Sequence, residues 1–480
     1  MKNNKVRSES TKKMSKKLLE PGLPRGFEDS FGKSLIIEKK IKEIIEKNFL
    51  RYGYAEIKTS PFEYSENIGG FLTDDLNDFS KDIFTFDDKD KKISLRFDLS
   101  APLARVVSEK YLEFAFPFRR FQIAEVFRNE TSKTGRGRYR SFFQGDFDQI
   151  FFGKVPSQAN AEILQIICDT MFDLKFKKDQ FKINIFNRKI IEGLLNDLKI
   201  KDENQRFKVL RAIDKYDRID ENFIDLLQKE RVDPVSGDKI TGANLSNDQA
   251  KLIIEFLKLK DLKDLKLECK NELQKEGIKE LEEIFEILND NKYLDQVQVD
   301  SSKVRGLNYY DSVTFETTIN FKVKNKQNKL VELGSVASGG SYAKLCSRFK
   351  GGANFEGTGC SFGISRLVYL ILQLDQLEAT QQLPVIICTM NKNYFSYANE
   401  IANILRKNNI NTEIYSDPNK NLGKQLTYAN KKGNPVACII GDNEFKDQTI
   451  TLKNLMAKKG ENNQTTIKKE NLINEIKKYI

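Results

Sequence analysis

The segments FRRFQIAEVFRNE (residues 118–130) and RYRSFFQGDFDQIFF (residues 138–152) decide the fold of this chain. Both are rich in aromatic and β-branched residues, and a loop of Ser, Thr, Lys and Gly separates them, which predicts a long antiparallel hairpin. Residues two apart on a strand share a face, so Gln144, Asp146 and Asp148 are expected to line up together. We therefore predict a sheet whose open face binds a polar ligand.

Further regions surround this hairpin in the sequence. Residues 1–20 are basic and are expected to form a disordered, solvated tail. Residues 21–184 and 301–375 mix helix and strand patterns, which indicates one α+β domain around the hairpin. Residues 185–300 carry Lys, Glu and Leu at helical spacing, which predicts a helical insertion. After a linker, residues 383–480 alternate strand and helix patterns, which predicts a small α/β domain.

The composition excludes several kinds of catalytic site. The 480 residues include no His and no Trp. Ser-His-Asp and Cys-His nucleophile systems and histidine-ligated metal sites therefore cannot form, and proton transfer depends on carboxylates, Tyr, Lys or the substrate. Lys plus Arg total 80 and Asp plus Glu total 69, which gives a net charge of +11. That excess suits a polyanionic partner such as nucleic acid, and a bias toward Lys, Asn and Ile explains it as well.

The cysteines and the apolar segments indicate a cytoplasmic protein. The six Cys are scattered without a CxxC pair, which suits reduced thiols better than disulfides or a zinc site. No apolar run approaches the roughly 20 residues that a membrane span needs, and the basic start lacks the apolar segment of a secretory signal. We expect a cytoplasmic location and no contact with a membrane.

Several segments together resemble the signatures of one enzyme family. The hairpin resembles motif 2 of class II aminoacyl-tRNA synthetases, and GTGCSFGISRL (residues 357–367) resembles their motif 3. Three further segments are similar to signatures of histidyl-tRNA synthetases: VRGLNYYDSVTFE (304–316), ASGGSYAKL (337–345) and PGLPRGFEDSFG (21–32). Motifs 2 and 3 alone indicate only class II, whereas the RGLxYY segment beside them is specific for histidine. The resemblance covers nearly the whole chain after the tail.

This resemblance implies the fold, the reaction and the partners. It implies an α+β catalytic domain with a class II antiparallel sheet, a helical insertion and a C-terminal α/β anticodon-binding domain. The implied activity is that of a histidine–tRNA ligase, in which L-histidine and ATP, with Mg²⁺, give histidyl-adenylate and pyrophosphate. The histidyl group then passes to the 3′ end of tRNA(His). Motif 1, around residues 59–64, forms the dimer interface in this class, so we expect a homodimer.

By the same resemblance, three arginines act on the phosphates. Amino-acid activation brings a carboxylate against the α-phosphate of ATP, and the planar fork of Arg matches both groups. Arg128 would hold the α-phosphate and the substrate carboxylate, and Arg305 would stabilise the transferring phosphoryl group. Arg366 would grip the γ-phosphate and stack on adenine, with Phe142 on the other side of the ring. Glu130 would accept a hydrogen bond from the adenine amino group or help to hold the metal.

The resemblance also implies a histidine pocket. The residues that would bind histidine are Asp98, Leu99, Ser100, Gln144, Asp148, Arg305, Tyr309 and Tyr310. Asp98 would pair with the α-ammonium, and Gln144 would bind the amino or carboxylate end. Asp148 would accept a hydrogen bond from the imidazole, and the two tyrosines would close the pocket and bond the other ring nitrogen.

Some signatures differ from their usual form. Ser341 and Ala343 stand where Arg and Asp are usual, and Asp311 and Ser312 stand where Thr and Gly are usual. We expect positions 341 and 343 to brace the pocket rather than take part in the chemistry. The motif 2 loop NETSKTGRGRYR (residues 129–140) also differs from the common bacterial form, and in the family it contacts the acceptor end of the tRNA. These departures suit a divergent branch of the family.

Plainer interpretations stay open for single residues and for the whole chain. Arg119, Arg120 and Arg138 suit a solvated strand face, and the two tyrosines suit a core. A non-catalytic histidine-sensing or regulatory paralogue, such as the regulatory subunit of ATP phosphoribosyltransferase, would keep the fold, and so would an RNA-binding scaffold. Such regulatory paralogues lack the C-terminal domain and the catalytic arginine, whereas this sequence keeps both.

Overall fold

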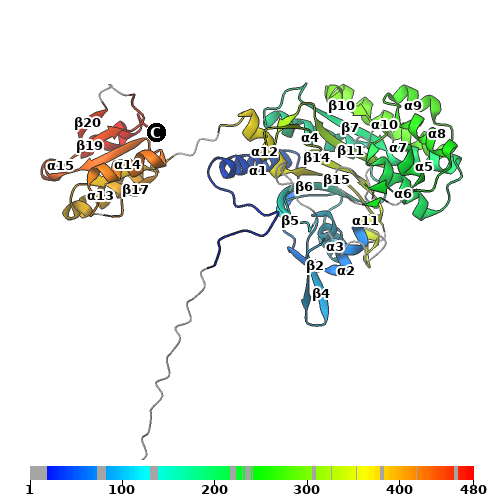
Figure 1. Cartoon of the computed structure of the whole chain (residues 1–480), viewed down its shortest axis with the longest axis horizontal. Helices are drawn as coiled ribbons and strands as arrows, with labels where there is room; N and C mark the ends of the chain where they lie inside the picture. Colours follow the sequence, from blue (N-terminus) through cyan, green and yellow to red (C-terminus); the bar gives the residue numbers. More distant parts are fainter. Residues whose placement is uncertain are drawn as a thin grey trace, which may run out of the picture. The chain divides into compact units, whose positions relative to one another are not determined.

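The structure of the chain, a computed structural model, comprises two compact units, residues 1–378 and residues 379–480 (Figure 1). It describes residues 19–72, 83–129, 139–216, 223–229, 231–232, 239–240, 242–304, 310–325, 327–352, 354–378, 383–417, 419–458 and 463–480. Almost all of the predicted tail lies outside these ranges. Within them, no helix is long and apolar enough to cross a bilayer.

An eight-stranded sheet forms the centre of the first unit, in the order β1-β5-β6-β15-β14-β11-β7-β10. The predicted hairpin is present, with β5 (Phe118–Phe127) antiparallel to β6 (Ser141–Phe152). The next neighbour of β6 is β15 (Phe355–Gly363), so motifs 2 and 3 lie side by side. The other strands are β1 (Ala55–Glu56), β14 (Ala337–Tyr342), β11 (Val313–Ile319), β7 (Phe181–Asn187) and β10 (Val297–Val299). The pairs from β5 to β7 are all antiparallel, as the predicted fold class requires.

Helices α1 (Lys33–Arg51), α4 (Ser157–Asp173) and α12 (Ile364–Leu374) pack on one face of this sheet (Figure 1). The helically spaced residues Ile37, Ile41, Ile45 and Phe49 of α1 are buried. The ring centroid of Phe49 lies 4.6 Å from that of Phe147 on β6. Because side chains alternate along a strand, Asp146 and Asp148 point to the opposite face of β6.

A smaller sheet, in the order β2-β4-β3, flanks the hairpin. Strand β2 (Phe62–Tyr64) begins directly after Pro61, which has no N–H to donate to a ladder. The other elements here are α2 (Ser65–Leu72), β3 (Thr85–Asp88), β4 (Lys91–Leu95), α3 (Ser100–Lys110) and a 3-10 turn (Tyr111–Glu113). Beyond β11 lie β12 (Val323–Lys324), β13 (Leu330–Val331) and α11 (Lys344–Ser347).

The helical insertion leaves the sheet after β7 and returns before β10. Its elements are α5 (Arg188–Asp197), α6 (Glu203–Ile213), α7 (Phe223–Gln228), β8 (Arg231–Val232), β9 (Lys239–Ile240), α8 (Asn247–Leu257), α9 (Leu262–Glu268) and α10 (Glu272–Asp290). The predicted bounds, 185–300, were wrong at both ends, because residues 185–187 and 297–299 belong to sheet strands. Three residues at the end of a strand are too few to show a period of two, so the adjoining helical pattern hid them.

The second unit contains a five-stranded sheet in the order β17-β16-β18-β19-β20. The first three strands are parallel, as the predicted α/β pattern requires, and the last two add antiparallel pairs. The strands are β16 (Val385–Thr389), β17 (Thr412–Ile414), β18 (Val436–Ile440), β19 (Thr449–Asn454) and β20 (Gln464–Lys468). The helices are α13 (Phe395–Lys407), α14 (Leu422–Lys432), α15 (Asp442–Asp447) and α16 (Leu472–Ile476). The sequence did not predict β20, because this edge strand is polar and buries only Ile467.

Candidate active site

A cavity of about 520 Å³ opens on the face of β6 that points away from α1. The strand contributes Gln144, Asp146 and Asp148 to the cavity wall, as their shared face predicted. The predicted site residues that line it are Asp98, Ser100, Arg128, Phe142, Gln144, Asp148, Tyr310 and Arg366. The fold thus brings residues from four separate sequence motifs to one site.

Both carboxylate oxygens of Asp148 are held in place. Oδ2 lies 2.5 Å from Nη2 of Arg120, and Oδ1 accepts a hydrogen bond of 2.7 Å from the Tyr342 hydroxyl. Arg120 is fully buried, so its interpretation as a solvated strand residue was wrong. Burial raises the pKa of Asp148, and the charge of Arg120 and the hydrogen bond from Tyr342 oppose that rise. Each oxygen keeps lone pairs for a ligand, so Asp148 is an oriented acceptor at the cavity wall.

The neighbouring strand leaves room for this carboxylate. Gly359 of β15 lies opposite Asp148 in the pairing of β15 with β6. A Cβ atom at position 359 would lie 2.0 Å from Oδ1 of Asp148. Any larger residue would displace the carboxylate, which explains the second glycine of GTGCSFG.

Arg128 lies between two aromatic rings just after the end of β5. Its guanidinium carbon is 4.2 Å from the ring centroid of Phe97 and 5.1 Å from that of Phe142. Its Nε also donates to the carbonyl of Phe97 over 3.3 Å. On α12, Nη1 of Arg366 donates to the carbonyl of Ser335. These contacts fix two cations in the cavity wall, where they can bind anionic groups.

Asp98 closes the turn that begins α3. Its Oδ1 accepts hydrogen bonds from the backbone N–H groups of Ser100 and Ala101, at 3.2 and 3.0 Å. Burial raises the pKa of Asp98, while the hydrogen bond from Ala101 and the charge of Arg128 act in the other direction. Leu99 differs from the expectation, because it is fully buried and is not among the cavity-lining residues. A leucine at the start of α3 packs into the core, and only its two polar neighbours face the cavity.

Gln144 and Asp146 are the other polar groups of β6 in the wall. Within the described residues, the buried Oε1 atom of Gln144 has no hydrogen-bond partner, so it is available to a ligand. Asp146 accepts a hydrogen bond of 2.5 Å from the Ser361 hydroxyl. Burial raises the pKa of Asp146 to about 7, although the charge of Arg120 and the hydrogen bond from Ser361 lower it. The sequence placed Asp146 on this face but gave it no role.

The sequence did not predict that the insertion lines the cavity. Arg211, at the end of α6, and the following Asp214 and Lys215 belong to the wall. The guanidinium of Arg211 also lies 5.4 Å from the ring centroid of Phe207. No local motif marks these residues, since a helical period indicates a helix but not which of its ends meets another part of the chain.

Some predicted site residues lie outside the described part of the chain: Glu130, Arg305 and Tyr309. Arg128, two residues before Glu130, and Tyr310, directly after Tyr309, both line the cavity. Among the residues that the structure describes, no cluster of three or more Cys, Asp or Glu side chains could hold a metal ion.

The fold and the site together define the class of protein. An antiparallel sheet carries an arginine and a phenylalanine on its hairpin, and a second arginine stands on the helix that follows a glycine-rich strand. This arrangement is that of the class II aminoacyl-tRNA synthetases.

Comparison with known proteins narrows the class to one family. A family model described as histidyl-tRNA synthetase matches residues 26–367, and one described as an anticodon binding domain matches residues 382–479. The chain is 54% identical over 464 residues to the histidine–tRNA ligase of Pelagibacter ubique, which covers 96% of this chain and 98% of that one. It is 35% identical to the enzyme of Rhizobium meliloti, over 94% and 90% of the two chains. The crystal structure of histidyl-tRNA synthetase from Nostoc sp. matches with a TM-score of 0.72 at 25% identity, over 96% of this chain and 100% of that one. The chain belongs to the histidyl-tRNA synthetase family.

Membership in this family decides between the functional alternatives. The chain is an enzyme, an aminoacyl-tRNA synthetase, rather than a regulatory paralogue or an RNA-binding scaffold. Its second unit corresponds to the anticodon-binding domain.

Proposed function

We propose that the cavity beside β6 and β15 carries out both half-reactions of a histidine–tRNA ligase. Histidine and ATP react there to give histidyl-adenylate and pyrophosphate, and the histidyl group then passes to the 3′ end of tRNA(His). The observation that carries this proposal is the position of Asp148, fixed by Arg120 and Tyr342 in the same cavity as Arg128 and Arg366. A buried carboxylate selects a substrate N–H, and the two arginines attract the anions that must react.

The arginines support the activation step. A carboxylate oxygen of histidine attacks the α-phosphorus of ATP, the bond to the bridging oxygen breaks, and pyrophosphate leaves. Arg128 holds the two anions together, and Arg305 stabilises the charge that develops on the transferring phosphoryl group. Arg366 binds the γ-phosphate and Phe142 stacks on adenine, and Glu130 accepts from the adenine amino group. No histidine base is needed, because the attacking carboxylate is already ionised.

The acidic and amide groups support the selection of histidine. Asp98 pairs with the α-ammonium group beside Ser100, and Gln144 binds the amino end with its unsatisfied Oε1 or the carboxylate end with its side-chain N–H groups. Asp148 accepts a hydrogen bond from one imidazole nitrogen. Tyr310, together with Tyr309, closes the pocket over the ring.

Mg²⁺ enters with ATP as part of the substrate. It neutralises phosphate charge and prefers phosphate oxygens and water to an all-protein cage. That preference suits a cavity whose described walls hold no preformed cluster of metal ligands.

The small sheet β2-β4-β3 supports a homodimer. It exposes Phe62, Tyr64 and Phe86 at 47%, 44% and 47%, and the rings of Phe62 and Phe86 lie 6.4 Å apart. Clustered exposed rings of this kind mark an interaction surface, and residues 62 and 64 fall within the motif 1 region. A second copy of the chain is the partner that we propose.

The second unit supports binding of tRNA through its anticodon arm. The described lysines that we assign to phosphate contacts are Lys424, Lys431, Lys432, Lys453 and Lys458, while Lys459 lies outside the described residues. Tyr428 is 42% exposed beside Lys432 and offers a ring for base stacking. We place the enzyme in the cytoplasm, where all six free, buried thiols stay reduced.

Pyrophosphate exchange tests the proposal. Purified protein is incubated with ATP, Mg²⁺ and labelled pyrophosphate, with and without histidine. Label should enter ATP only when histidine is present, and histidinol or glutamine should not replace it. Exchange that is independent of histidine, or no exchange by a folded protein, would overturn the proposed function.

A further inference from the structure

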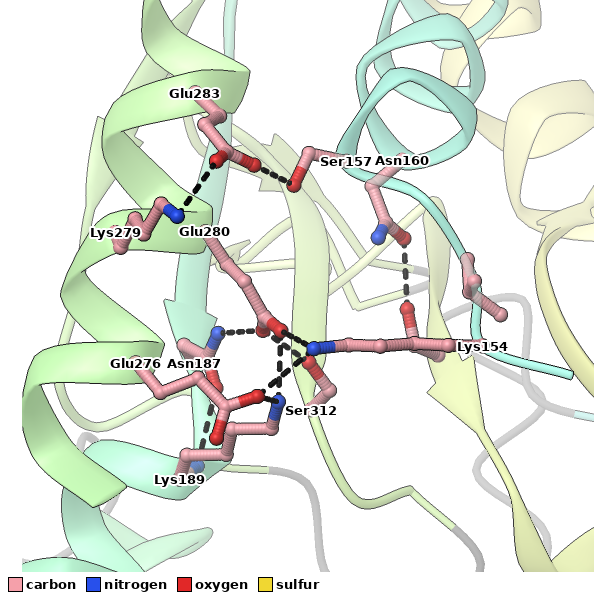
Figure 2. Close-up of polar contacts among 12 residues, drawn as sticks. Lys154, Ser157, Asn160, Asn187, Lys189, Glu276, Lys279, Glu280, Glu283 and Ser312 are labelled. Atoms are coloured by element: carbon pink, nitrogen blue, oxygen red, sulfur yellow. Dashed lines mark hydrogen bonds and ion pairs between the residues drawn. The ribbon is translucent and has the colours of Figure 1, made fainter. Parts of the chain in front are cut away.

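An ionic cluster joins α10 of the insertion to the strands of the catalytic sheet (Figure 2). It comprises Lys154, Lys189, Glu276 and Glu280, and we call it the α10 cluster. Nζ of Lys189 lies 2.8 Å from Oε1 of Glu276 and 2.7 Å from Oε1 of Glu280. Nζ of Lys154 lies 2.8 and 3.3 Å from the same two atoms. Two ammonium groups thus neutralise two carboxylates that stand one helical turn apart.

Glu280 is the member of this cluster that reaches into the sheet. Its side chain is 13% exposed, against 45% for Glu276. Its second oxygen, Oε2, accepts hydrogen bonds of 2.7 Å from Nδ2 of Asn187 and from the hydroxyl of Ser312. Burial raises the pKa of Glu280, but the hydrogen bonds from Lys189, Ser312 and Asn187 outweigh it and hold the pKa below its ordinary value. Glu280 is therefore ionised, and both of its carboxylate oxygens accept hydrogen bonds.

Ser312 belongs to a short segment that ends in the active-site cavity. Tyr310, two residues earlier, lines the cavity, and its carbonyl accepts a hydrogen bond of 2.7 Å from Nη1 of Arg188. The backbone N–H of Arg188 donates to the carbonyl of Ser312 over 2.9 Å. The segment 310–312 is thus held at its backbone by Arg188 and at its side chain by Glu280.

The helix that carries Glu280 is itself fixed in position. α10 packs on α5 so closely that a Cβ atom at Gly277 would lie 2.8 Å from Cγ1 of Ile190. Figure 2 shows Glu276 and Glu280 on the face of α10 that points toward Lys154, Lys189 and Ser312. A rigid helix therefore sets where the Ser312 hydroxyl stands.

We propose that Glu280 is a positioning residue for histidine binding, which acts through Ser312 on the backbone that places Tyr310 in the cavity. This inference rests on the proposed function, in which Tyr310 closes the histidine pocket. Glu280 touches neither substrate, so its loss affects how well the pocket is assembled for histidine. ATP contacts other parts of the wall, and its binding does not depend on Ser312.

The chain offers a matched control one turn further along α10. Glu283 accepts a hydrogen bond of 2.6 Å from the Ser157 hydroxyl, and Lys279 lies 3.9 Å away. Both Glu280 and Glu283 therefore join α10 to another element through a serine, whereas Lys279 lies on α10 itself. Glu280 contacts Ser312 of the segment 310–312, whereas Glu283 contacts Ser157 at the start of α4.

The test compares Glu280→Ala, Ser312→Ala, their combination and Glu283→Ala by pyrophosphate exchange. The KM for histidine should rise about tenfold in Glu280→Ala, which corresponds to about 1.4 kcal/mol, and by a smaller factor in Ser312→Ala. The KM for ATP should stay within about twofold in every variant, which corresponds to a change of about 0.4 kcal/mol or less in binding free energy. The combined variant should be no worse than Glu280→Ala, because both changes break one connection.

Several results would overturn the inference. One is an equal rise of both KM values in Glu280→Ala, and another is the same rise for histidine in Glu283→Ala, since either indicates general destabilisation. If Glu280→Ala fails to fold, Ser312→Ala decides, and an unchanged KM for histidine rejects the role. Asp148→Asn, measured in parallel, separates this inference from the proposed function. A normal histidine KM in Asp148→Asn means that the pocket itself is wrongly assigned.

Discussion

The carboxylate of Asp311 accepts a hydrogen bond of 2.7 Å from the backbone N–H of Ala343. Both positions depart from the usual family signatures, in which residue 311 is Thr and residue 343 is Asp. Ala343 lies at the N-cap of α11. The backbone N–H of Asp311 also donates to the carbonyl of Ser341 over 3.2 Å. The two unusual positions therefore contact each other directly in the fold.

The remaining departures also have local partners. The hydroxyl of Ser341, where Arg is usual, donates to Oδ1 of Asn160 over 2.8 Å. The hydroxyl of Ser312, where Gly is usual, donates to Glu280. Each unusual residue thus makes a short hydrogen bond that its usual counterpart would not make in the same form.

Loss of the Asp311 carboxylate should destabilise the first unit. We expect Asp311→Ala to lower the free energy of unfolding by about 1–3 kcal/mol, because a charge-assisted hydrogen bond is lost and a backbone N–H is left without its acceptor. Asp311→Thr combined with Ala343→Asp should recover most of that loss. Urea unfolding followed by far-UV circular dichroism measures both, since the chain has no Trp to report by fluorescence. Equal stability of Asp311→Ala and the parent would show that the contact contributes nothing.

Asp148 should govern the affinity for histidine. A site built to bond a substrate N–H rejects ligands that cannot supply it, by as much as about 10⁴-fold. Asp148→Ala should therefore raise the KM for histidine far more than that for ATP in pyrophosphate exchange. Asp148→Asn serves as the control that keeps the side-chain volume next to Arg120. A histidine KM within about twofold of the parent value, under half a kcal/mol, would exclude this role.

Arg305 should act in the transition state. It lies outside the described residues, and its expected role comes from the RGLxYY signature. Arg305→Ala should lower the rate of adenylate formation by at least about 100-fold, the loss that follows removal of one preorganised donor. Single-turnover measurement of adenylate formation checks the step directly. A folded variant with a near-normal rate would refute the assignment.

Asp146 should make the stability of the free enzyme depend on pH. Its pKa is about 7 in the folded chain, against about 3.9 for an unfolded Asp, so the folded state binds the extra proton between these values. The free energy of unfolding should therefore fall as the pH rises from about 4 to about 7, and the contribution is lost above the folded pKa. Asp146→Asn cannot titrate and should flatten that dependence, as urea midpoints at pH 5 and pH 8 would show. Parallel curves for variant and parent would assign the effect to another group.

The second unit should be dispensable for activation and necessary for charging. It forms its own compact core, so ending the chain at residue 378 should leave the first unit folded. The truncated enzyme should keep histidine-dependent pyrophosphate exchange, whereas aminoacylation of tRNA should fall steeply because the anticodon arm loses its contacts. Addition of the separate second unit is not expected to restore charging at micromolar concentrations, because the covalent link supplies the effective concentration. Equal loss of both reactions would point to a structural role for the second unit.

The sequence predicted those features that depend on local pattern. The alternation along residues 141–152 indicates both the strand and the face shared by Gln144 and Asp148, because the period of two is a property of the strand itself. Arg120 was misjudged because its charge suggests solvent, and only the pairing of β5 with β6 places it beside Asp148. Arg211 was missed for a related reason, since nothing near it in sequence indicates that α6 ends at the cavity.

The buried pair of Arg120 and Asp148 makes substrate choice a property of two positions at once. A laboratory that wished to reassign this enzyme to an amino acid without an imidazole would begin by varying residue 148. Each uncharged replacement there would leave a guanidinium without its counter-ion in the protein interior, which costs about 3–5 kcal/mol, a large part of the roughly 5–15 kcal/mol that stabilises a typical domain. Libraries that vary position 148 alone should therefore yield destabilised variants, whereas libraries that vary residues 120 and 148 jointly can keep the charge balanced. A change of this enzyme's amino-acid specificity should therefore need simultaneous substitutions at positions 120 and 148.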